Sequence, residues 1–124
     1  MAVKVVDASA LAAVLFGEPE AETMVDRLQG YALAAPLLLS FELASICLKK
    51  VKRYPAKRTL LLEALQLFGQ MDIAQIKVNV CEVVTLAEHK RLSTYDASYL
   101  WLAQQFGAEL VTLDKTLDKA AQAK

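Results

Sequence analysis

Short β-branched segments alternate with longer helical segments along the whole chain, and this alternation restricts the possible folds more than any other feature. The expected strands cover residues 4–6, 31–35, 76–80 and 109–113. The expected helices cover residues 9–16, 20–29, 37–54, 57–71, 82–92, 96–106 and 116 to the end. Strands separated by helices pair in parallel through right-handed crossovers. The sequence therefore predicts a three-layer α/β/α domain with a central parallel sheet of about four to five strands.

Length and composition favour one soluble domain. The 124 residues, with no internal repeat or linker, predict a single domain over residues 1–124. Hydrophobic residues make up 56% of the chain, which argues against disorder. Charges interrupt every apolar run before it reaches the roughly 20 residues of a membrane span, and residues 1–7 show no signal-peptide pattern. We expect a cytoplasmic protein with no membrane partner.

The two cysteines do not form a metal-binding pattern. Cys47 and Cys81 lie far apart, and neither belongs to a CxxC or Cys/His motif. We expect both to be small buried residues in a reducing compartment.

Three aspartates stand at the ends of expected elements. Asp7 follows the first strand, Asp114 follows the last, and Asp96 begins a helix. Ligands of parallel α/β sheets bind beyond the carboxyl ends of the strands, so these side chains are candidates for one site. Aspartate is also a preferred N-cap, and all three precede helices. Helix capping therefore remains an alternative for each of them.

Glu42 is harder to explain by local structure. It lies in an apolar helical segment with Leu38 and Ile46 one turn away, and the first base is Lys49. We expect this helix to be buried on most sides, where a carboxylate is costly unless it is paired or binds a metal. A long-range salt bridge or a backbone hydrogen bond remains an alternative. Converging carboxylates without local bases suit a hard divalent cation such as Mg²⁺.

Four stretches carry a resemblance to a known family. They read VVDASAL at 5–11, FELA at 41–44, LSTYDASY at 92–99 and LVTLDKTL at 110–117. In order, spacing and chain length they closely resemble the PIN-domain family, in particular VapC-type toxins. The resemblance covers essentially the entire chain.

The resemblance implies an acidic pocket that binds Mg²⁺ or Mn²⁺. Carried over by position, the catalytic and metal-binding quartet consists of Asp7, Glu42, Asp96 and Asp114. Ser9 and Thr112 match the supporting hydroxyl positions beside the first and last acids. Asp118, one turn beyond Asp114, is an alternative outer ligand.

The activity implied by the resemblance is that of a metal-dependent endoribonuclease. A metal-activated water would hydrolyse RNA phosphodiesters, and the protein would be the toxin of a VapBC-type toxin–antitoxin system. Such proteins usually form homodimers and are neutralised by a VapB-type antitoxin. The alternatives are a non-catalytic PIN-fold module that binds metal or RNA, and a receiver-type phosphoacceptor domain. The receiver is disfavoured because the expected strand at 76–80, taken as central, has no aspartate at its end.

Two further features bear on an RNA partner. A run of bases near the end of a helix is a candidate for phosphate contacts: Lys49, Lys50, Lys52 and Arg53. The alternative is a solvated helix terminus, where bases complement the helix dipole. Tyr95, adjacent to Asp96, is a candidate for stacking on a base, but we expect it to pack. Tyr99, Trp101 and Leu102 are expected as core or dimer contacts.

Overall fold

A four-stranded parallel sheet forms the centre of the molecule. The computed structural model describes residues 2–123. The strands are β1 (Val3–Val6), β2 (Ala32–Pro36), β3 (Ile73–Ile76) and β4 (Glu109–Val111). Their order is β3-β2-β1-β4, and all neighbouring pairs are parallel. In the register, Val5 of β1 is paired with Ala34 on one side and Leu110 on the other. The parallel sheet predicted from the sequence is confirmed.

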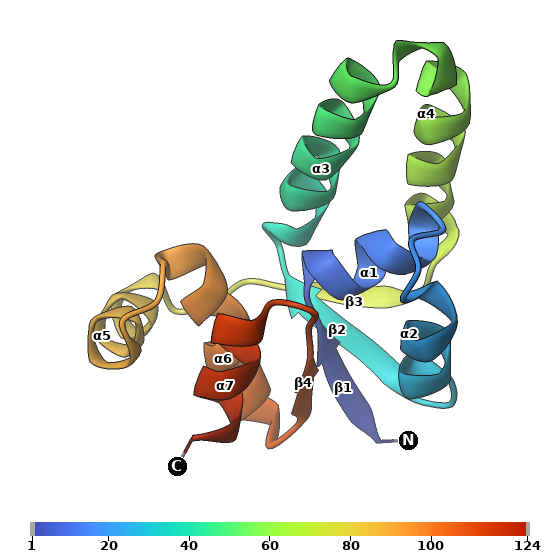
Figure 1. Ribbon diagram of the computed structural model, residues 1–124. Helices are drawn as coiled ribbons and strands as arrows, with labels where there is room; N and C mark the ends of the chain where they lie inside the picture. The colour runs from blue at the N-terminus through green and yellow to red at the C-terminus, as the bar shows by residue number, and fades with distance from the viewer. Residues whose placement is uncertain (1, 124) are drawn as a thin grey trace.

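Helices cover both faces of this sheet. They are α1 (Ala8–Leu15), α2 (Ala21–Leu28), α3 (Leu39–Arg53), α4 (Arg58–Leu67), α5 (Val80–Lys90), α6 (Thr94–Phe106) and α7 (Lys115–Gln122). Two short 3₁₀ turns, η1 (Pro55–Lys57) and η2 (Phe68–Gln70), flank α4. In Figure 1, α1 and α2 lie on one side of the sheet, and α6 and α7 lie on the other. The predicted three-layer α/β/α architecture is confirmed.

The core lies between the central strands and the helices packed on them. Val5, Val6 and Val111 of the sheet are fully buried, together with Leu11 of α1 and Leu102 of α6. β-Branched residues are favoured on such a pleated, two-sided surface. This packing fixes the carboxyl ends of β1 and β4, from which the acidic residues emerge.

The third strand lies elsewhere than the sequence pattern predicts. The strand expected at 76–80 is wrong, because β3 spans Ile73–Ile76 and is an edge strand. The side chain of Asn79 accepts a hydrogen bond from the backbone N–H of Glu82 at 3.1 Å and caps α5. Residues 77–79 therefore form a connection, and their alternating pattern does not reflect a strand.

One of the two cysteine predictions is also wrong. Cys47 is buried as expected, but Cys81 is exposed. Cys81 lies in the first turn of α5, which packs through Val83 and Ala87 on another face of the helix. Within residues 2–123, no helix has the length and low charge content of a membrane-spanning segment.

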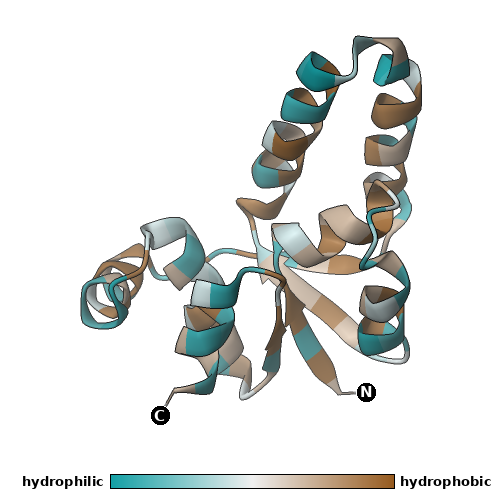
Figure 2. Cartoon of the chain, in the orientation of Figure 1, coloured by the Kyte–Doolittle hydropathy of each residue, from teal (hydrophilic) through white to brown (hydrophobic). Residues whose placement is uncertain are grey.

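Helices α3 and α4 form an antiparallel arm that extends away from the sheet (Figure 1). Only Leu39, Leu43 and Cys47 of α3 are buried, and none of the described residues of α4 is buried. The expectation that the helix around Glu42 is buried on most sides is therefore wrong. Hydrophobic residues run along α4, whereas hydrophilic residues gather at the far end of α3 (Figure 2). The arm places Glu42 near the sheet and the basic residues away from it.

Candidate active site

The first and last aspartates meet where the strand order reverses. Asp7 directly follows β1, and Asp114 lies three residues beyond β4, the strand beside it. The backbone N–H of Asp7 donates to the carbonyl of Val111 at 3.1 Å, which joins the two strand ends. From this point the chain leads to β2 on one side, while β4 returns on the other. Such a switch point is where open α/β sheets bind their ligands.

The Asp7 carboxylate is held by three hydrogen bonds. The side chain is 5% exposed. Its Oδ1 accepts from Ser9 Oγ at 2.7 Å and from the backbone N–H of Ala10 at 3.0 Å. Its Oδ2 accepts from Thr112 Oγ1 at 2.5 Å. The Ala10 contact caps α1, so the capping alternative holds for Asp7, and the two hydroxyls fix the carboxylate in addition.

The same two hydroxyls also order the loop that carries Asp114. Ser9 Oγ accepts from the backbone N–H of Leu113 at 2.9 Å, and Thr112 Oγ1 accepts from that of Asp114 at 3.0 Å. Asp114 Oδ1 in turn accepts from the backbone N–H of Leu117 at 2.8 Å and caps α7. Ser9 and Thr112 thus tie the first acid to the last.

Asp96 does not cap its helix. α6 begins at Thr94, and Ser93 is the N-cap, whose Oγ accepts from the backbone N–H of Asp96 at 3.1 Å. The capping alternative is therefore wrong for Asp96, because a better cap lies three residues earlier. Within residues 2–123 its carboxylate has no hydrogen bond or ion pair, and this leaves both oxygens available to a ligand.

Glu42 is held by a residue whose role the sequence did not reveal. Tyr99 is 1% exposed, and its hydroxyl donates to Glu42 Oε1 at 2.6 Å. Tyr99 is a core residue as expected, but it also reaches the site. Tyr99 lies three residues after Asp96 and shares its face of α6. This spacing is the sequence feature that could have predicted a place for Tyr99 at the site. Within the described chain Glu42 has no salt bridge, and its hydrogen bond comes from a side chain.

All four acids line one cavity, which we name the acidic cavity. Its volume is about 260 Å³. The lining residues are Asp7, Ala8, Ser9, Glu42, Ser45, Ile46, Lys49, Asp96, Tyr99 and Asp114. Lys49, singled out in the sequence as a phosphate contact, stands at this cavity. No ion pair within residues 2–123 neutralises any of the four acids.

Burial and repulsion between the acids raise the pKa of three of these carboxylates, those of Asp7, Glu42 and Asp96. Burial raises the pKa of Asp7, and the negative charge of Asp114 raises it further. The hydrogen bonds from Thr112 and Ser9 lower it, but the net shift is upward. Burial likewise raises the pKa of Glu42, with repulsion from Asp7 and Asp96. The pKa of Asp96 is raised by burial, then by Asp114 and Asp7. The site therefore has an excess of negative charge.

This donor set fits a hard divalent cation. The candidate ligands are carboxylate oxygens, which Mg²⁺ prefers. Within residues 2–123, no three acidic, histidine or cysteine side chains converge closely enough to hold one ion directly. Mg²⁺ is commonly bound through one or two carboxylates while it keeps several waters, so this spacing suits it.

The raised pKa values predict how the metal-free protein responds to pH. The folded state binds protons at Asp7, Glu42 and Asp96 more tightly than the unfolded chain, whose values are 3.8 for Asp and 4.5 for Glu. Stability is therefore lost as pH rises through the raised values and regained as it falls toward the ordinary ones. We expect a higher Tm in EDTA at about pH 5 than at about pH 8, and a smaller difference in Asp96→Asn. A Tm in EDTA that increases throughout this range would contradict the prediction.

The basic residues do not form one patch at the site. Lys50 Nζ is paired with Glu18 at 2.8 Å, and Arg53 lies over the ring of Tyr54 at 5.4 Å. Lys52 is exposed on the far part of α3. Of the four candidates for RNA contacts, Lys49 alone lines the acidic cavity.

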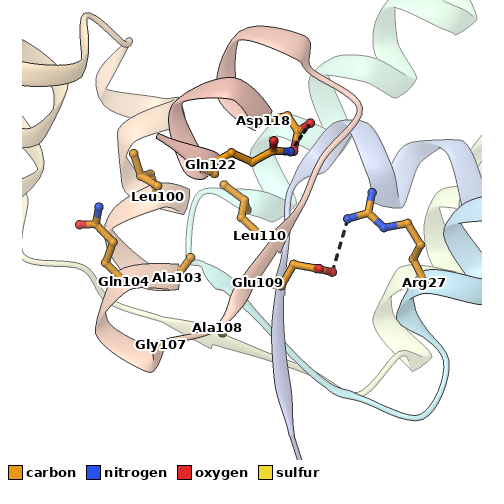
Figure 3. A pocket seen from close by; sticks show the side chains of 11 residues that line it. Arg27, Leu100, Ala103, Gln104, Gly107, Ala108, Glu109, Leu110, Asp118 and Gln122 are labelled. Carbon is orange, nitrogen blue, oxygen red and sulfur yellow. Dashed lines mark hydrogen bonds and ion pairs between the residues drawn. The ribbon is translucent and has the colours of Figure 1, made fainter. Parts of the chain in front are cut away.

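A second cavity, of about 280 Å³, lies between the start of β4 and helices α6 and α7 (Figure 3). Its charged groups are already partnered: Arg27 is paired with Glu109 at 3.4 Å, and Asp118 accepts from Gln122 at 3.1 Å. Asp118 lines this second cavity, whereas Asp114 lines the acidic cavity. The two cavities are similar in volume. The acidic cavity differs in that none of its four acids forms an ion pair within residues 2–123.

The fold and the site define an α/β protein with a carboxylate-lined cavity at the switch point of a parallel sheet. A model of the PIN domain matches residues 4–123, and the chain belongs to the PIN-domain family. Proteins of this family are usually nucleases. The crystal structure of PAE2754 from Pyrobaculum aerophilum is similar, with a TM-score of 0.77 and 25% identity over 98% of this chain and 89% of that one. A comparison with curated proteins gave no match.

The family and the sheet order also exclude the receiver-type alternative, for a reason other than the expected one. The strand used against it is an edge strand at Ile73–Ile76, and the central strand β1 does end at an aspartate. Receiver-like sheets have the order 2-1-3-4-5. The order here is β3-β2-β1-β4, which is incompatible with that fold.

Proposed function

We propose that this protein is a Mg²⁺- or Mn²⁺-dependent endoribonuclease. The observation that carries the proposal is the acidic cavity. Four different parts of the fold each contribute one carboxylate to it, and none of these carboxylates forms an ion pair within the described part of the chain, residues 2–123. The catalytic residues would be Asp7, Glu42, Asp96 and Asp114, and these acids would hold the ion directly or through its waters. When bound, the ion supplies an activated water and stabilises the charge that builds on the phosphodiester.

The other residues of the cavity orient these groups. Ser9 and Thr112 hold Asp7 by their hydroxyl donors, and Tyr99 holds Glu42 in the same way. Such outer partners fix the direction of a ligand and are important for metal affinity. Lys49, at the edge of the cavity, is positioned to contact the RNA backbone, which gives affinity that does not depend on sequence.

Cleavage of RNA by the purified protein tests the proposal. We expect structured or unstructured RNAs to be cut with Mg²⁺ or Mn²⁺, to be left intact with EDTA, and to yield products with a 5′-phosphate and a 3′-hydroxyl. Cleavage that persists in EDTA would contradict the metal dependence. Folded protein that binds but never cuts a varied set of RNAs would instead favour a non-catalytic PIN module.

We further propose that the protein acts in the cytoplasm as the toxin of a VapBC-type pair and forms a homodimer. A VapB-type antitoxin would neutralise it by placing a segment in the acidic cavity. The arm supports self-association, because α4 has leucines at 60, 61, 62, 65 and 67 and none of its described residues is buried. Leucines of this kind are commonly covered by a protein partner.

A further inference from the structure

Two aromatic side chains beside the acidic cavity are left in solvent. Phe41, in the first turn of α3, is 81% exposed, and Tyr95, in the first turn of α6, is 63% exposed. The expectation that Tyr95 packs is therefore wrong. Each lies next in sequence to an acid of the site, Glu42 and Asp96. A buried Phe side chain stabilises a fold by leaving water, and the exposed ring of Phe41 contributes little of this stabilisation.

These rings border a third cavity, which we name the aromatic cavity. It has a volume of about 340 Å³, and its lining residues are Leu38, Phe41, Glu42, Ser45 and Tyr95. Glu42 and Ser45 also line the acidic cavity, so the two cavities are neighbours that share these two residues. A molecule in the aromatic cavity would therefore lie beside Glu42, one of the four acids.

We propose that the aromatic cavity binds one unstacked base of single-stranded RNA, next to the phosphate that enters the acidic cavity. The inference rests on the proposed nuclease function and adds to it a base-binding subsite formed by Phe41 and Tyr95. Proteins read single-stranded RNA by stacking splayed bases on aromatic rings. Phe41 and Tyr95 supply such rings, while Glu42 and Ser45 supply polar atoms at the edge of the hollow.

The position of the two cavities side by side favours a nucleotide over a second copy of the chain. A nucleotide carries a flat base and a charged phosphate. The site offers the aromatic cavity for the base and, beside it, the acidic cavity, whose bound cation would hold the phosphate. A protein surface over Phe41 would also lie against Glu42 and Ser45, which the acidic cavity needs open to its substrate.

Binding of RNAs that lack one base tests the inference. Fluorescence anisotropy with Mg²⁺ would measure the affinity of a labelled single-stranded RNA for the full chain carrying Asp114→Asn. We expect this substitution to block cleavage, and it keeps an oxygen to cap α7. An abasic nucleotide is then moved along the RNA one position at a time. We expect one position where loss of the base weakens binding roughly 5- to 100-fold, as for other stacked bases.

Phe41→Ala identifies the cavity responsible. We expect it to weaken binding of intact RNA by a similar factor and to remove the sensitivity at that position, because base and ring then act as one pair. Phe106→Ala is the matched control, since Phe106 is 46% exposed at the other end of α6. Alanine favours helix, so the Tm should be maintained in both variants.

Two outcomes would overturn the inference. In the first, Phe41→Ala leaves RNA affinity unchanged, and a shift in sedimentation in the same variant would assign the rings to a contact between copies of the chain. In the second, the loss of affinity in Phe41→Ala adds to the loss at every abasic position, so that ring and base act independently. Binding is measured without cleavage, so these outcomes are distinguishable from a failure of the nuclease proposal.

Discussion

Asp96→Asn is expected to lower Mg²⁺-dependent cleavage of RNA by more than a hundredfold. Loss of an outer partner of a metal ligand already costs about 10- to 100-fold, and loss of a ligand should exceed this. The metal-free protein should be at least as stable as the wild type, because the substitution removes a carboxylate whose pKa is raised by burial and by the other acids. Cleavage rates in Mg²⁺ and Tm values in EDTA measure the two effects.

Asp118→Asn is the matched control for this substitution. Asp118 is also an aspartate in the first turn of a helix, but it lines the second cavity and is bonded to Gln122. We expect the cleavage rate of the Asp118→Asn variant to stay within about twofold of the wild type, as for a surface substitution away from the site. A large loss with Asp118→Asn and none with Asp96→Asn would contradict the proposed quartet.

Two substitutions of Asp7 should separate its structural role from its chemical one. Asp7→Ala removes the cap of α1 and leaves the hydroxyls of Ser9 and Thr112 without their acceptor. We expect it to destabilise the protein by about 1–3 kcal/mol and to lower the Tm by several degrees. Asp7→Asn keeps an oxygen for the cap and should hold its Tm.

Both variants of Asp7 should lose cleavage by a hundredfold or more, since neither offers a carboxylate to the cation. Thermal unfolding and RNA cleavage are compared on the same preparations. If Asp7→Asn keeps full cleavage while Asp7→Ala unfolds, Asp7 is a cap and a link between strands and has no part in the chemistry.

The features that the sequence predicted well depend on neighbours along the chain. Val5 and Val6 lead into Asp7, so the end of β1 could be found locally, whereas β4 was predicted to end at residue 113 and ends at Val111. The third strand could not be placed, because alternation at 76–80 resembles a strand until Asn79 is seen to cap α5. An edge strand has few buried residues, and its pattern is correspondingly weak.

Side-chain environments that depend on distant packing were less accessible. The apolar residues around Glu42 predicted a buried helix, but α3 extends away from the sheet and leaves Phe41 in solvent. The hydrogen bond between Tyr99 and Glu42 joins residues 57 positions apart, and only the packing of α6 on the sheet brings Tyr99 to the start of α3. Asp96 matched a cap by type, whereas the hydroxyl of Ser93 fills that position.

The hydrogen bond between Thr112 and Asp7 joins residues 105 positions apart, nearly the full length of the chain. Chains are synthesised from the N-terminus, and their domains fold as units during synthesis. A growing chain that ends before β4 lacks Thr112 and Asp114 and holds Asp7 without its last partner. The acidic cavity can therefore form only after β4 and the loop that follows it have folded against β1.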